Sequence, residues 1–376
     1  MTKRAGVHLG LALWLALLAC LPGRGQDSRP AEQAPAASSS STNLTLLPVV
    51  FYTPETHWAG GLAGLLSFWP ASQRVGTRPS TISAYAIYTE LRQFQLEIDP
   101  ILYFDDEDLL LQGNWILERY PNKYWGIGND ALEAHETNYT PGRVFLETSF
   151  QKRLLAEQNL YIGVQYQFEQ VTIIEAQRDG PLPFDETPGS AGGTVSGLGV
   201  ILNWDTRDHI FIPSRGNYFQ VSLSVNSSAL GSDFSFTEIK ADLRKFFRGL
   251  AASHVLGLHL LYQSVIGGTP PFFRYARLGS DNIMRGYYAG RFRDRHLLAA
   301  QAEYRLPVWW KFGLVGFFGL GRVAPDLSGL GLSGMKYSAG LGLRFKIAPR
   351  EGANLRVDWA FGQGTSGLYF TAGEAF

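Results

Sequence analysis

Arg285 is the residue of this 376-residue chain whose setting points most clearly to a dedicated role. It lies in the stretch Met284-Arg285-Gly286-Tyr287, between two segments that alternate in polarity. Arg285 is either an ordinary exposed loop residue or one drawn into a confined interior, where a guanidinium needs carboxylates or carbonyl oxygens to compensate its lost hydration. Glu303 and Asp358 are the best candidates, because both are predicted on the inward face of nearby strands and can accept charge-assisted hydrogen bonds. Gly286 permits a tight bend beside the arginine.

Other groups that could do chemistry give weaker signals. A lipase would need a serine, a histidine and an orienting partner, and the nearest candidate, His259, is more typical of a hydrogen-bonded wall residue. The seven histidines lack metal-ligand spacing. The acidic run Asp105-Asp106-Glu107-Asp108 has the oxygen ligands of a divalent-cation site, although a solvated turn is the commoner role. We therefore expect no enzymatic activity, no cofactor and no resident metal.

The elements that would position these side chains are strands with two different faces. Residues 160–170 place apolar side chains on one face and Gln165, Gln167 and Glu169 on the other. Residues 237–244 likewise set four charged side chains opposite three apolar ones, and residues 337–346 and 354–361 repeat the pattern. Successive side chains of a strand point to opposite faces, so one face suits lipid and the other suits water. The pattern predicts an all-β fold.

Several features favour a membrane barrel over a soluble sandwich with the same alternation. The strands run for about ten residues, a secretion signal precedes them, and the last strand carries an aromatic residue at its end. The chain contains 42 Gly, 24 Phe, 17 Tyr and 9 Trp, a bias seen in transmembrane barrels. Its 33 basic and 33 acidic residues balance, so nothing indicates a nucleic-acid surface. We predict an integral, transmembrane antiparallel β-barrel in the outer membrane of a diderm bacterium, in contact with its lipids.

The N-terminal residues are expected to direct export. Lys3 and Arg4 precede an apolar run that is too short to cross a bilayer as a helix, which is typical of a signal peptide. We assign residues 1–25 to the signal peptide, 26–45 to a flexible periplasmic lead rich in Ser, Ala, Pro and Gln, and 46–376 to the barrel. Cys20 leaves lipidation open as an alternative, because Leu17-Leu18-Ala19-Cys20 resembles a lipoprotein signal.

The strand count is predicted to be sixteen. Fifteen strands can be placed directly, at residues 57–69, 80–91, 93–104, 108–120, 143–155, 159–171, 194–206, 216–225, 234–247, 253–265, 296–307, 312–323, 336–347, 354–362 and 367–376. Bacterial single-chain barrels have even strand numbers. Either residues 46–52 or residues 124–128 are therefore expected to supply the last one.

Several motifs of the chain resemble those of the BamA/TamA family of outer-membrane barrel proteins (bacterial surface antigen type). Met284-Arg285-Gly286-Tyr287 is similar to the family's loop-six motif, and Gln301-Ala302-Glu303-Tyr304-Arg305-Leu306-Pro307 to the strand after it. Asp205-Thr206-Arg207-Asp208 resembles the family's periplasmic turn. The final strand, with Leu368, Phe370 and Phe376 facing outward, resembles the signal that the barrel-assembly machinery reads during biogenesis. The resemblance implies that loop six folds into the lumen.

Two departures from the family pattern bear on function. The roughly twenty-five mature residues expected before the first strand are too few for the POTRA domains that usually receive clients, which suggests a short form without them. Phe317-Phe318-Gly319 has glycine where the family usually carries the aspartate that meets the loop arginine. The resemblance implies a role in outer-membrane protein assembly or translocation through a weak seam between the first and last strands. A gated channel for a small solute or polypeptide, or a scaffold for a periplasmic or outer-membrane protein partner, remains the alternative.

Overall fold

The computed structural model describes residues 42–53, 57–69, 77–155, 159–180, 184–251, 253–348 and 353–376. They fall within one folded unit, which is built almost entirely from strands. The signal peptide, most of the predicted lead and Cys20 lie outside the described residues. Within the described part of the chain, none of the helices has the length and apolar character needed to cross a bilayer.

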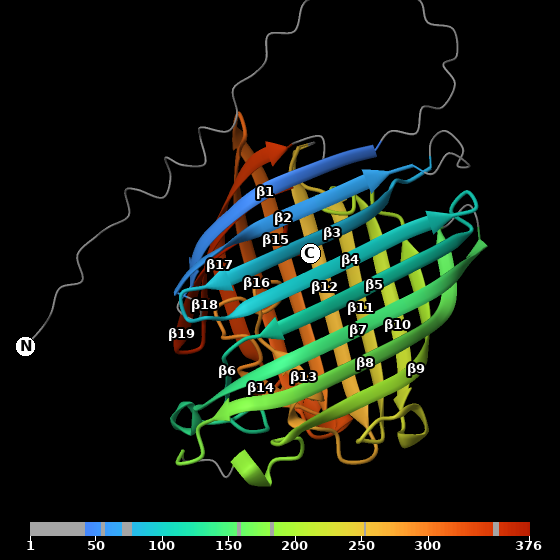
Figure 1. Ribbon diagram of the computed structural model, residues 1–376. Coiled ribbons are helices and arrows are strands. Elements are labelled where there is room, and N and C mark those ends of the chain that lie inside the picture. The colour runs from blue at the N-terminus through green and yellow to red at the C-terminus, as the bar shows by residue number, and fades with distance from the viewer. Residues whose placement is uncertain are drawn as a thin grey trace, which may run out of the picture. The chain divides into compact units, whose positions relative to one another are not determined.

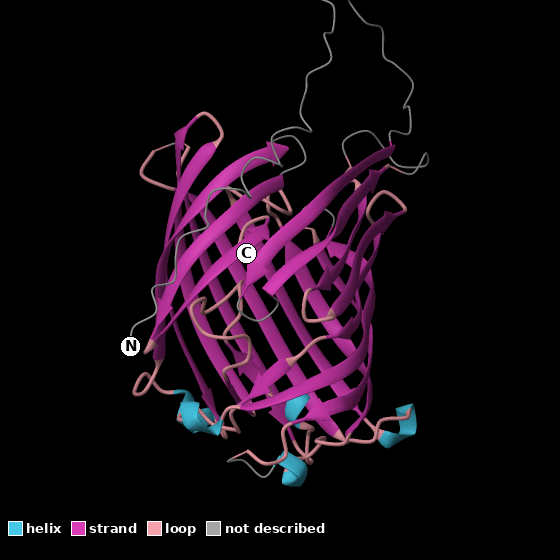
Figure 2. Ribbon diagram, turned by 60° about the vertical axis from the view of Figure 1, so that its left-hand side comes forward, coloured by secondary structure: helices cyan, strands magenta, loops and turns pink. Residues whose placement is uncertain are grey.

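In the described part of the chain, a meander of sixteen long strands forms the wall of a barrel (Figures 1 and 2). Each strand pairs antiparallel with the next long strand in the chain. They are β1 (Thr42–Thr53), β2 (His57–Phe68), β3 (Ser80–Thr89), β4 (Phe94–Phe104), β5 (Leu109–Arg119), β7 (Thr137–Leu155), β8 (Leu160–Ala176), β9 (Gly192–Asp205), β10 (Gly216–Asn226), β11 (Phe236–Arg248), β12 (Val255–Ile266), β15 (His296–Trp309), β16 (Phe312–Ala324), β17 (Lys336–Ala348), β18 (Ala353–Gly362) and β19 (Thr365–Ala372). The predicted all-β antiparallel barrel is confirmed.

The strand that completes the count is β1, which contains one of the two segments considered from the sequence. The other, residues 124–128, contributes only Tyr124, the last residue of the short β6 (Asn122–Tyr124), which pairs with β7. Residues 267–295, between β12 and β15, form loop six and contain a small hairpin of β13 (Ala276–Leu278) and β14 (Phe292–Asp294). We call the end of the barrel where loop six begins the loop end, and the opposite end the turn end.

Short 3-10 helices gather at the loop end (Figure 2). They are η1 (Glu133–His135), η3 (Phe184–Glu186), η4 (Ser228–Leu230), η5 (Phe272–Arg274) and η6 (Leu327–Leu330). All of them lie in connections between strands, and η5 belongs to loop six. The loop end is therefore the more heavily covered mouth of the barrel.

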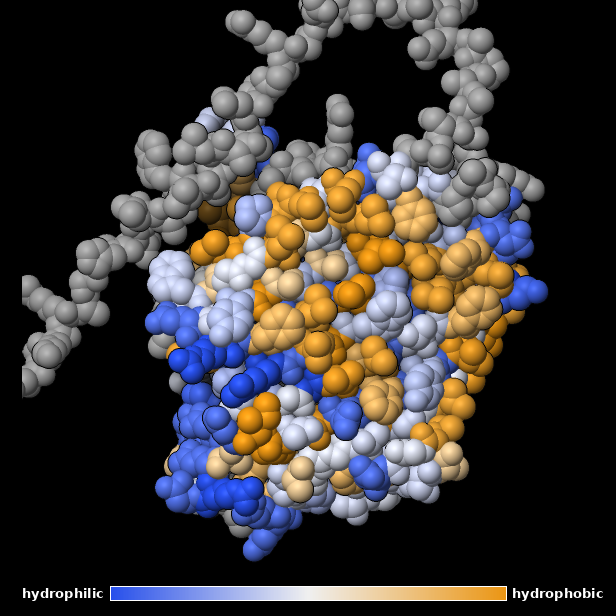
Figure 3. Space-filling view, viewed as in Figure 1, coloured by the Kyte–Doolittle hydropathy of each residue, from blue (hydrophilic) through white to orange (hydrophobic). Residues whose placement is uncertain are grey.

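Side chains alternate between the two faces of the wall as the sequence predicts. In β8, Ile162, Val164 and Tyr166 are 45%, 60% and 42% exposed, whereas the intervening Gln165 and Gln167 are buried. Figure 3 shows hydrophobic side chains spread over a broad area of the outer face. An outer apolar face and a polar interior are what a barrel in a bilayer requires.

The first and last strands of the meander, β1 and β19, come near each other. Among the described residues, however, no run of ladder pairs joins them, whereas each is paired along its length to its other neighbour. The last two strands are also short, since β19 has 8 residues and β18 has 10, against 19 in β7 and 17 in β8. We call the junction of β1 and β19 the seam.

The end of the chain departs from the sequence prediction. The last strand was predicted to continue to Phe376 with that side chain facing outward, but β19 ends at Ala372. Gly373 adopts a φ of +83°, which turns the chain away from the wall, and Phe376 is only 5% exposed. Leu368 and Phe370 do face outward. We call residues Gly373–Phe376 the tail.

Candidate functional site

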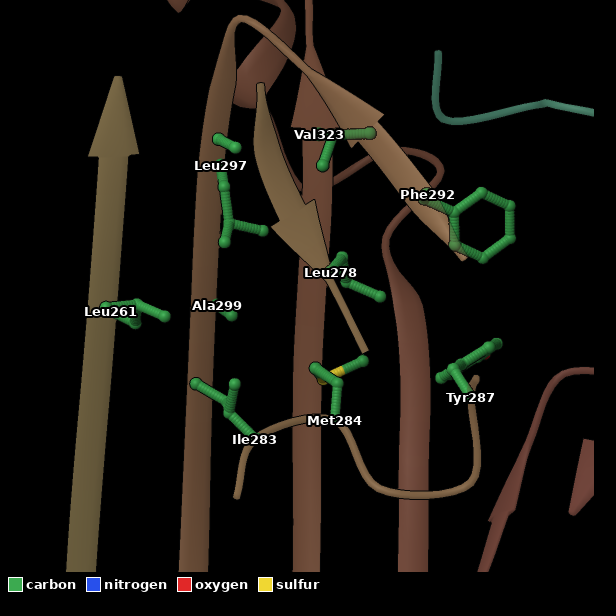
Figure 4. Close-up of a cluster of buried hydrophobic side chains, with 10 residues drawn as sticks. Leu261, Leu278, Ile283, Met284, Tyr287, Phe292, Leu297, Ala299 and Val323 are labelled. Carbon is green, nitrogen blue, oxygen red and sulfur yellow. The ribbon is translucent and has the colours of Figure 1, made fainter. Parts of the chain in front are cut away.

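Loop six enters the lumen through a hydrophobic cluster beneath the loop end (Figure 4). Side chains of the loop pack there against the inward faces of β12, β15 and β16. The cluster consists of Leu261, Ala276, Leu278, Ile283, Met284, Tyr287, Phe292, Leu297, Ala299 and Val323. Burial of these apolar groups stabilises the folded loop against the wall. Met284 and Tyr287 of the predicted motif belong to this packing, so they help to place Arg285 and Gly286, which lie between them.

Arg285 lies at the centre of a fully buried ion cluster. Its guanidinium donates to Glu303 Oε2 at 2.6 Å and also forms an ion pair with Asp358. All three side chains have no exposed surface. The structure thus brings Arg285 together with both carboxylates named from the sequence, one on β15 and the other on β18. Removal of one partner from a buried pair leaves an uncompensated charge, so the cluster fixes the position of loop six.

Phe317 is a contact of Arg285 that the sequence analysis did not assign. The guanidinium carbon lies 3.5 Å from the centre of the Phe317 ring, which provides a cation–π contact between two buried side chains. Gly319, at the position where the family usually has aspartate, is in contact with loop six instead. A Cβ atom there would lie 3.2 Å from the Met284 sulfur. The missing aspartate therefore leaves room for Met284, and Glu303 with Asp358 supplies the negative charge.

Gly286 and Tyr287 hold the loop against the last three strands. Gly286 has a φ of +101°, and its amide donates to the Tyr369 hydroxyl on β19 at 2.8 Å. The Tyr287 hydroxyl donates to the Tyr337 carbonyl at 2.9 Å and accepts from the Gln363 amide at 2.7 Å. The Tyr287 ring lies against Gly362, where a Cβ would come within 2.6 Å. Loop six thus supports a seam strand from inside the barrel.

Two chains of ion pairs run from Arg285 to the tail. In the first, Glu303 also accepts from Arg305 Nε at 2.8 Å, and Arg305 Nη2 donates to the backbone oxygen of Phe376 at 2.9 Å. In the second, Asp358 also pairs with Arg344, whose Nε donates to Glu374 at 2.7 Å. Loop six and the tail consequently share both of their carboxylate partners on the wall.

The predicted turn motif also reaches this network. Arg207 forms a two-pronged pair with Asp205, at 2.9 and 2.7 Å, within the turn between β9 and β10. The same turn contains Pro213, whose carbonyl accepts from Arg305 Nη1 at 3.2 Å. Thr206 exchanges hydrogen bonds with Asn217 across the turn. The motif is therefore a structural turn that helps to place Arg305.

Asp208 closes the same turn by accepting hydrogen bonds from the Ser214 and Arg215 amides at 2.8 and 3.2 Å. Partial burial raises the pKa of Asp208, but hydrogen bonds from Ser214 and Arg215 outweigh it and lower that pKa below its ordinary value.

The outer part of loop six is held by a second ion cluster. Arg274 of η5 donates to Glu169 on β8 at 2.8 Å and to Glu238 on β11 at 2.9 Å. Burial lowers the pKa of Arg274, but the two carboxylates outweigh it and leave that pKa raised, so the residue stays charged. Because β8 and β11 are separated by two strands, Arg274 ties loop six across the interior of the barrel. The sequence analysis did not single out this residue.

His259, the histidine weighed from the sequence as a catalytic candidate, lies between an acidic and an aromatic side chain. His259 lies 3.1 Å from Asp242 and its ring is 5.0 Å from that of Phe376. The histidine that meets a serine is instead His296, whose Nδ1 is 2.8 Å from the Ser264 hydroxyl at the root of loop six, and both side chains are buried.

The acidic turn at residues 105–108 is paired with two arginines. Glu107 accepts from Arg78 at 3.0 Å, and Asp108 accepts from Arg153 Nε at 3.0 Å. Across the residues that the structure describes, no group of three or more His, Cys, Asp or Glu side chains is placed to hold a metal ion. The turn links neighbouring connections at the turn end.

Comparison with known proteins yields one family and a set of similar structures. A family model described as the Omp85 superfamily domain matches residues 78–376. BamA from Haemophilus ducreyi lacking POTRA domains 1–3 has a TM-score of 0.56 and 12% identity, over 89% of this chain and 69% of that one. CdiB from Acinetobacter baumannii has a TM-score of 0.53 and 10% identity, over 89% of this chain and 65% of that one. No curated protein matches. At these identities the two structures indicate a shared fold.

Proposed function

This chain belongs to the Omp85 superfamily, and on that premise we propose that it aids the assembly or translocation of proteins at the outer membrane by opening its seam. It is an outer-membrane β-barrel of the type seen in BamA and CdiB. The observation that carries the proposal is the junction of β1 and β19, which come near each other without ladder pairs among the described residues. Unpaired strand edges are templates for the addition of another strand.

Loop six is suited to control such an opening. It contacts β19 through Tyr369, and the Thr365 hydroxyl of β19 donates to the Gly286 carbonyl at 3.0 Å. The same loop is fixed to β15 and β18 through Arg285. Loop six therefore connects β19 to the buried ion cluster around Arg285.

The short strand β19 on one side of the seam would also disturb the bilayer. An eight-residue strand extends roughly 26 Å and, at a usual tilt of about 40°, spans about 20 Å along the membrane normal. This is less than the roughly 30 Å of a typical hydrocarbon core. We infer that lipid next to β19 is thinned, which lowers the barrier for a client strand to enter.

The test is to lock the seam covalently. Cysteines introduced at facing positions of β1 and β19 are oxidised, and the protein is reconstituted into liposomes together with an unfolded outer-membrane barrel. We expect insertion of the client to fall to the level of empty liposomes and to return on reduction. The matched control is a cysteine pair at Leu44 and Leu66, which are ladder partners in β1 and β2. Full insertion by the seam-locked form would contradict the proposal.

A second candidate function rests on the interior. A lumen cavity of about 620 Å³ lies between Asn282 of loop six and the tail, with Asp99 and Glu147 on its wall. Such a polar space suits a gated passage for a small solute, with loop six as the gate. Single-channel conductance in a planar bilayer separates the two functions. A steady, solute-sensitive current in the wild type would favour the passage, and a closed wild type whose Arg285→Ala variant conducts would favour a plugged barrel.

A further inference from the structure

The tail occupies a pocket on the lumen wall at the turn end. The ring of Phe376 lies 5.0 Å from that of His259 and 6.1 Å from that of Phe246, measured between centroids. Gly257 forms the floor, since a Cβ atom there would come within 3.0 Å of the Phe376 ring. Arg305 is placed beside the ring and donates to the backbone oxygen of the same residue. The pocket therefore contacts both the aromatic side chain and the backbone of Phe376.

A second part of the pocket binds the acidic side chain of Glu374, two positions before Phe376. The carboxylate of Glu374 accepts from Arg344 Nε and from Asn354 Nδ2, both at 2.7 Å. Its side chain and that of Arg344 are each only 5% exposed. No described partner recognises the side chain of Ala375, which is simply buried beside Phe376 and Phe246. The tail is thus held as an acidic residue, any small residue and an aromatic residue.

The charge of the wall explains why the pocket favours an acidic residue. The wall contributes three arginines and two carboxylates to the cluster, namely Arg305, Arg344, Arg356, Glu303 and Asp358. Loop six adds one charge of each sign, because Arg285 enters with Asp281, which pairs with Arg356 at 3.1 Å. These side chains leave one positive charge, and the tail brings two acceptors to it, namely the Glu374 carboxylate beside Arg344 and the carboxyl group of Phe376 beside Arg305. Burying an uncompensated charge is costly, so any occupant of the pocket must supply a carboxylate there.

Residues Glu374–Phe376 can leave without loss of strand pairing. They belong to no ladder, and the Gly373 amide keeps its hydrogen bond of 2.8 Å to the Asn354 carbonyl when they move. The walls lie in β11, β12, β15, β17 and β18, which pair with one another or with their neighbours. The tail also borders the cavity of about 620 Å³. The pocket is therefore preformed by the wall, and there is space beside it for a second segment to enter.

We propose that this pocket is an exchangeable binding site for peptide segments with an acidic residue two positions before an aromatic one, filled in this state by Glu374–Phe376. This activity goes beyond the proposed role of the seam, and either can exist without the other. Exchange at the pocket is transmitted to loop six, because Arg305 and Arg344 share Glu303 and Asp358 with Arg285.

The test uses the full chain in detergent and a fluorescein-labelled Gly-Glu-Ala-Phe peptide with an amidated end, read by fluorescence anisotropy. We expect the double variant Glu374→Ala/Phe376→Ala, which empties the pocket, to bind this peptide at least tenfold more tightly than the wild type. Peptides with Gln in place of Glu, or Ala in place of Phe, should bind the double variant at least tenfold more weakly. Equal binding by wild type and double variant, or no discrimination among the peptides, would overturn the proposal.

A third substitution locates the site. Adding Gly257→Leu to the double variant fills the floor of the pocket, so binding should be lost, and retained binding would place the peptide elsewhere and overturn the proposal. If the double variant fails to refold, hydrogen exchange of residues 374–376 in the wild type tests the proposal instead. Excess Glu-containing peptide should speed that exchange at least threefold over the Gln-containing peptide, and equal exchange rates would overturn the proposal.

Discussion

The guanidinium carbon of Arg285 lies 3.5 Å from the centre of the Phe317 ring. Phe317 belongs to β16, and the two carboxylates that pair with Arg285 belong to β15 and β18. The arginine is therefore held on three sides by strands from the last third of the barrel. Four predictions concern this centre, the bend beside it and the turn that supports it.

Arg285→Ala is expected to destabilise the barrel and loosen loop six. Breaking a buried pair costs about 3–5 kcal/mol, and the lower figure applies because Glu303 and Asp358 keep Arg305 and Arg344 as partners. The midpoint of unfolding in detergent and the heat-modifiability of the band on a gel measure the loss. Arg178→Ala is the control, since its pair with Asp185 is exposed and worth at most about 1 kcal/mol. Equal midpoints for the two variants would contradict the assignment.

Phe317→Leu should cost about 2 kcal/mol, because it removes a desolvated cation–π contact while keeping an apolar side chain. The specific claim is that most of this loss depends on Arg285. In a double-mutant cycle, Phe317→Leu should cost much less in the Arg285→Ala background than in the wild type. Additive losses would show that Phe317 acts only as packing.

Gly286→Ala should be much more harmful than Gly364→Ala. Both glycines have a positive φ, +101° and +74°, and a side chain costs about 1–2 kcal/mol in that region. At Gly286 the new Cβ would also lie 2.8 Å from the Phe361 carbonyl carbon, whereas nothing lies within 4 Å at Gly364. The unfolding midpoint of Gly364→Ala reports backbone strain alone, whereas that of Gly286→Ala reports backbone strain together with a steric clash. Similar midpoints would mean that loop six can move away from β18 at little cost.

Asp208→Asn should destabilise the turn between β9 and β10 in a pH-dependent way. The pKa of Asp208 is lowered in the folded protein, so its carboxylate stabilises the fold above the unfolded value of about 3.9 and loses this effect as the pH falls through the folded pKa. The melting temperature of the variant should therefore lie below that of the wild type at pH 7, and the difference should be smaller at pH 3. An equal difference at the two pH values would mean that Asp208 acts through the shape of the turn and not through its charge.

Alternation of side chains was sufficient to predict much of this site. It placed Glu303 and Asp358 on the inward face, and the structure brings both to Arg285. The same parity puts Phe317 inward, two residues before Gly319, so its contact could have been found from the sequence. Arg274 could not, because its partners lie on β8 and β11 and nothing in a linear pattern reports which strands a loop spans.

The tail was misjudged for a physical reason that the sequence does contain. If β19 continued with Leu368 and Phe370 outward, Glu374 would share their face and would point a carboxylate at the acyl chains. A charge on the lipid face is costly, so the strand has to end before Glu374, and Gly373 supplies the turn. The seam is different, because sequence alternation says nothing about whether the first and last strands form a ladder.

The meander and the Arg285 cluster also differ in how far apart in the chain their contacts are. Each long strand pairs with its neighbour in sequence, whereas Arg285 meets Asp358 across 73 residues and Arg305 meets Phe376 across 71. Closing longer loops costs more entropy and slows folding. The hairpins can therefore form in succession, while the cluster can be completed only after β18 and the tail are in place. The complete Arg285 cluster therefore requires that β15 and β18 have already been brought together by the pairing of the strands between them.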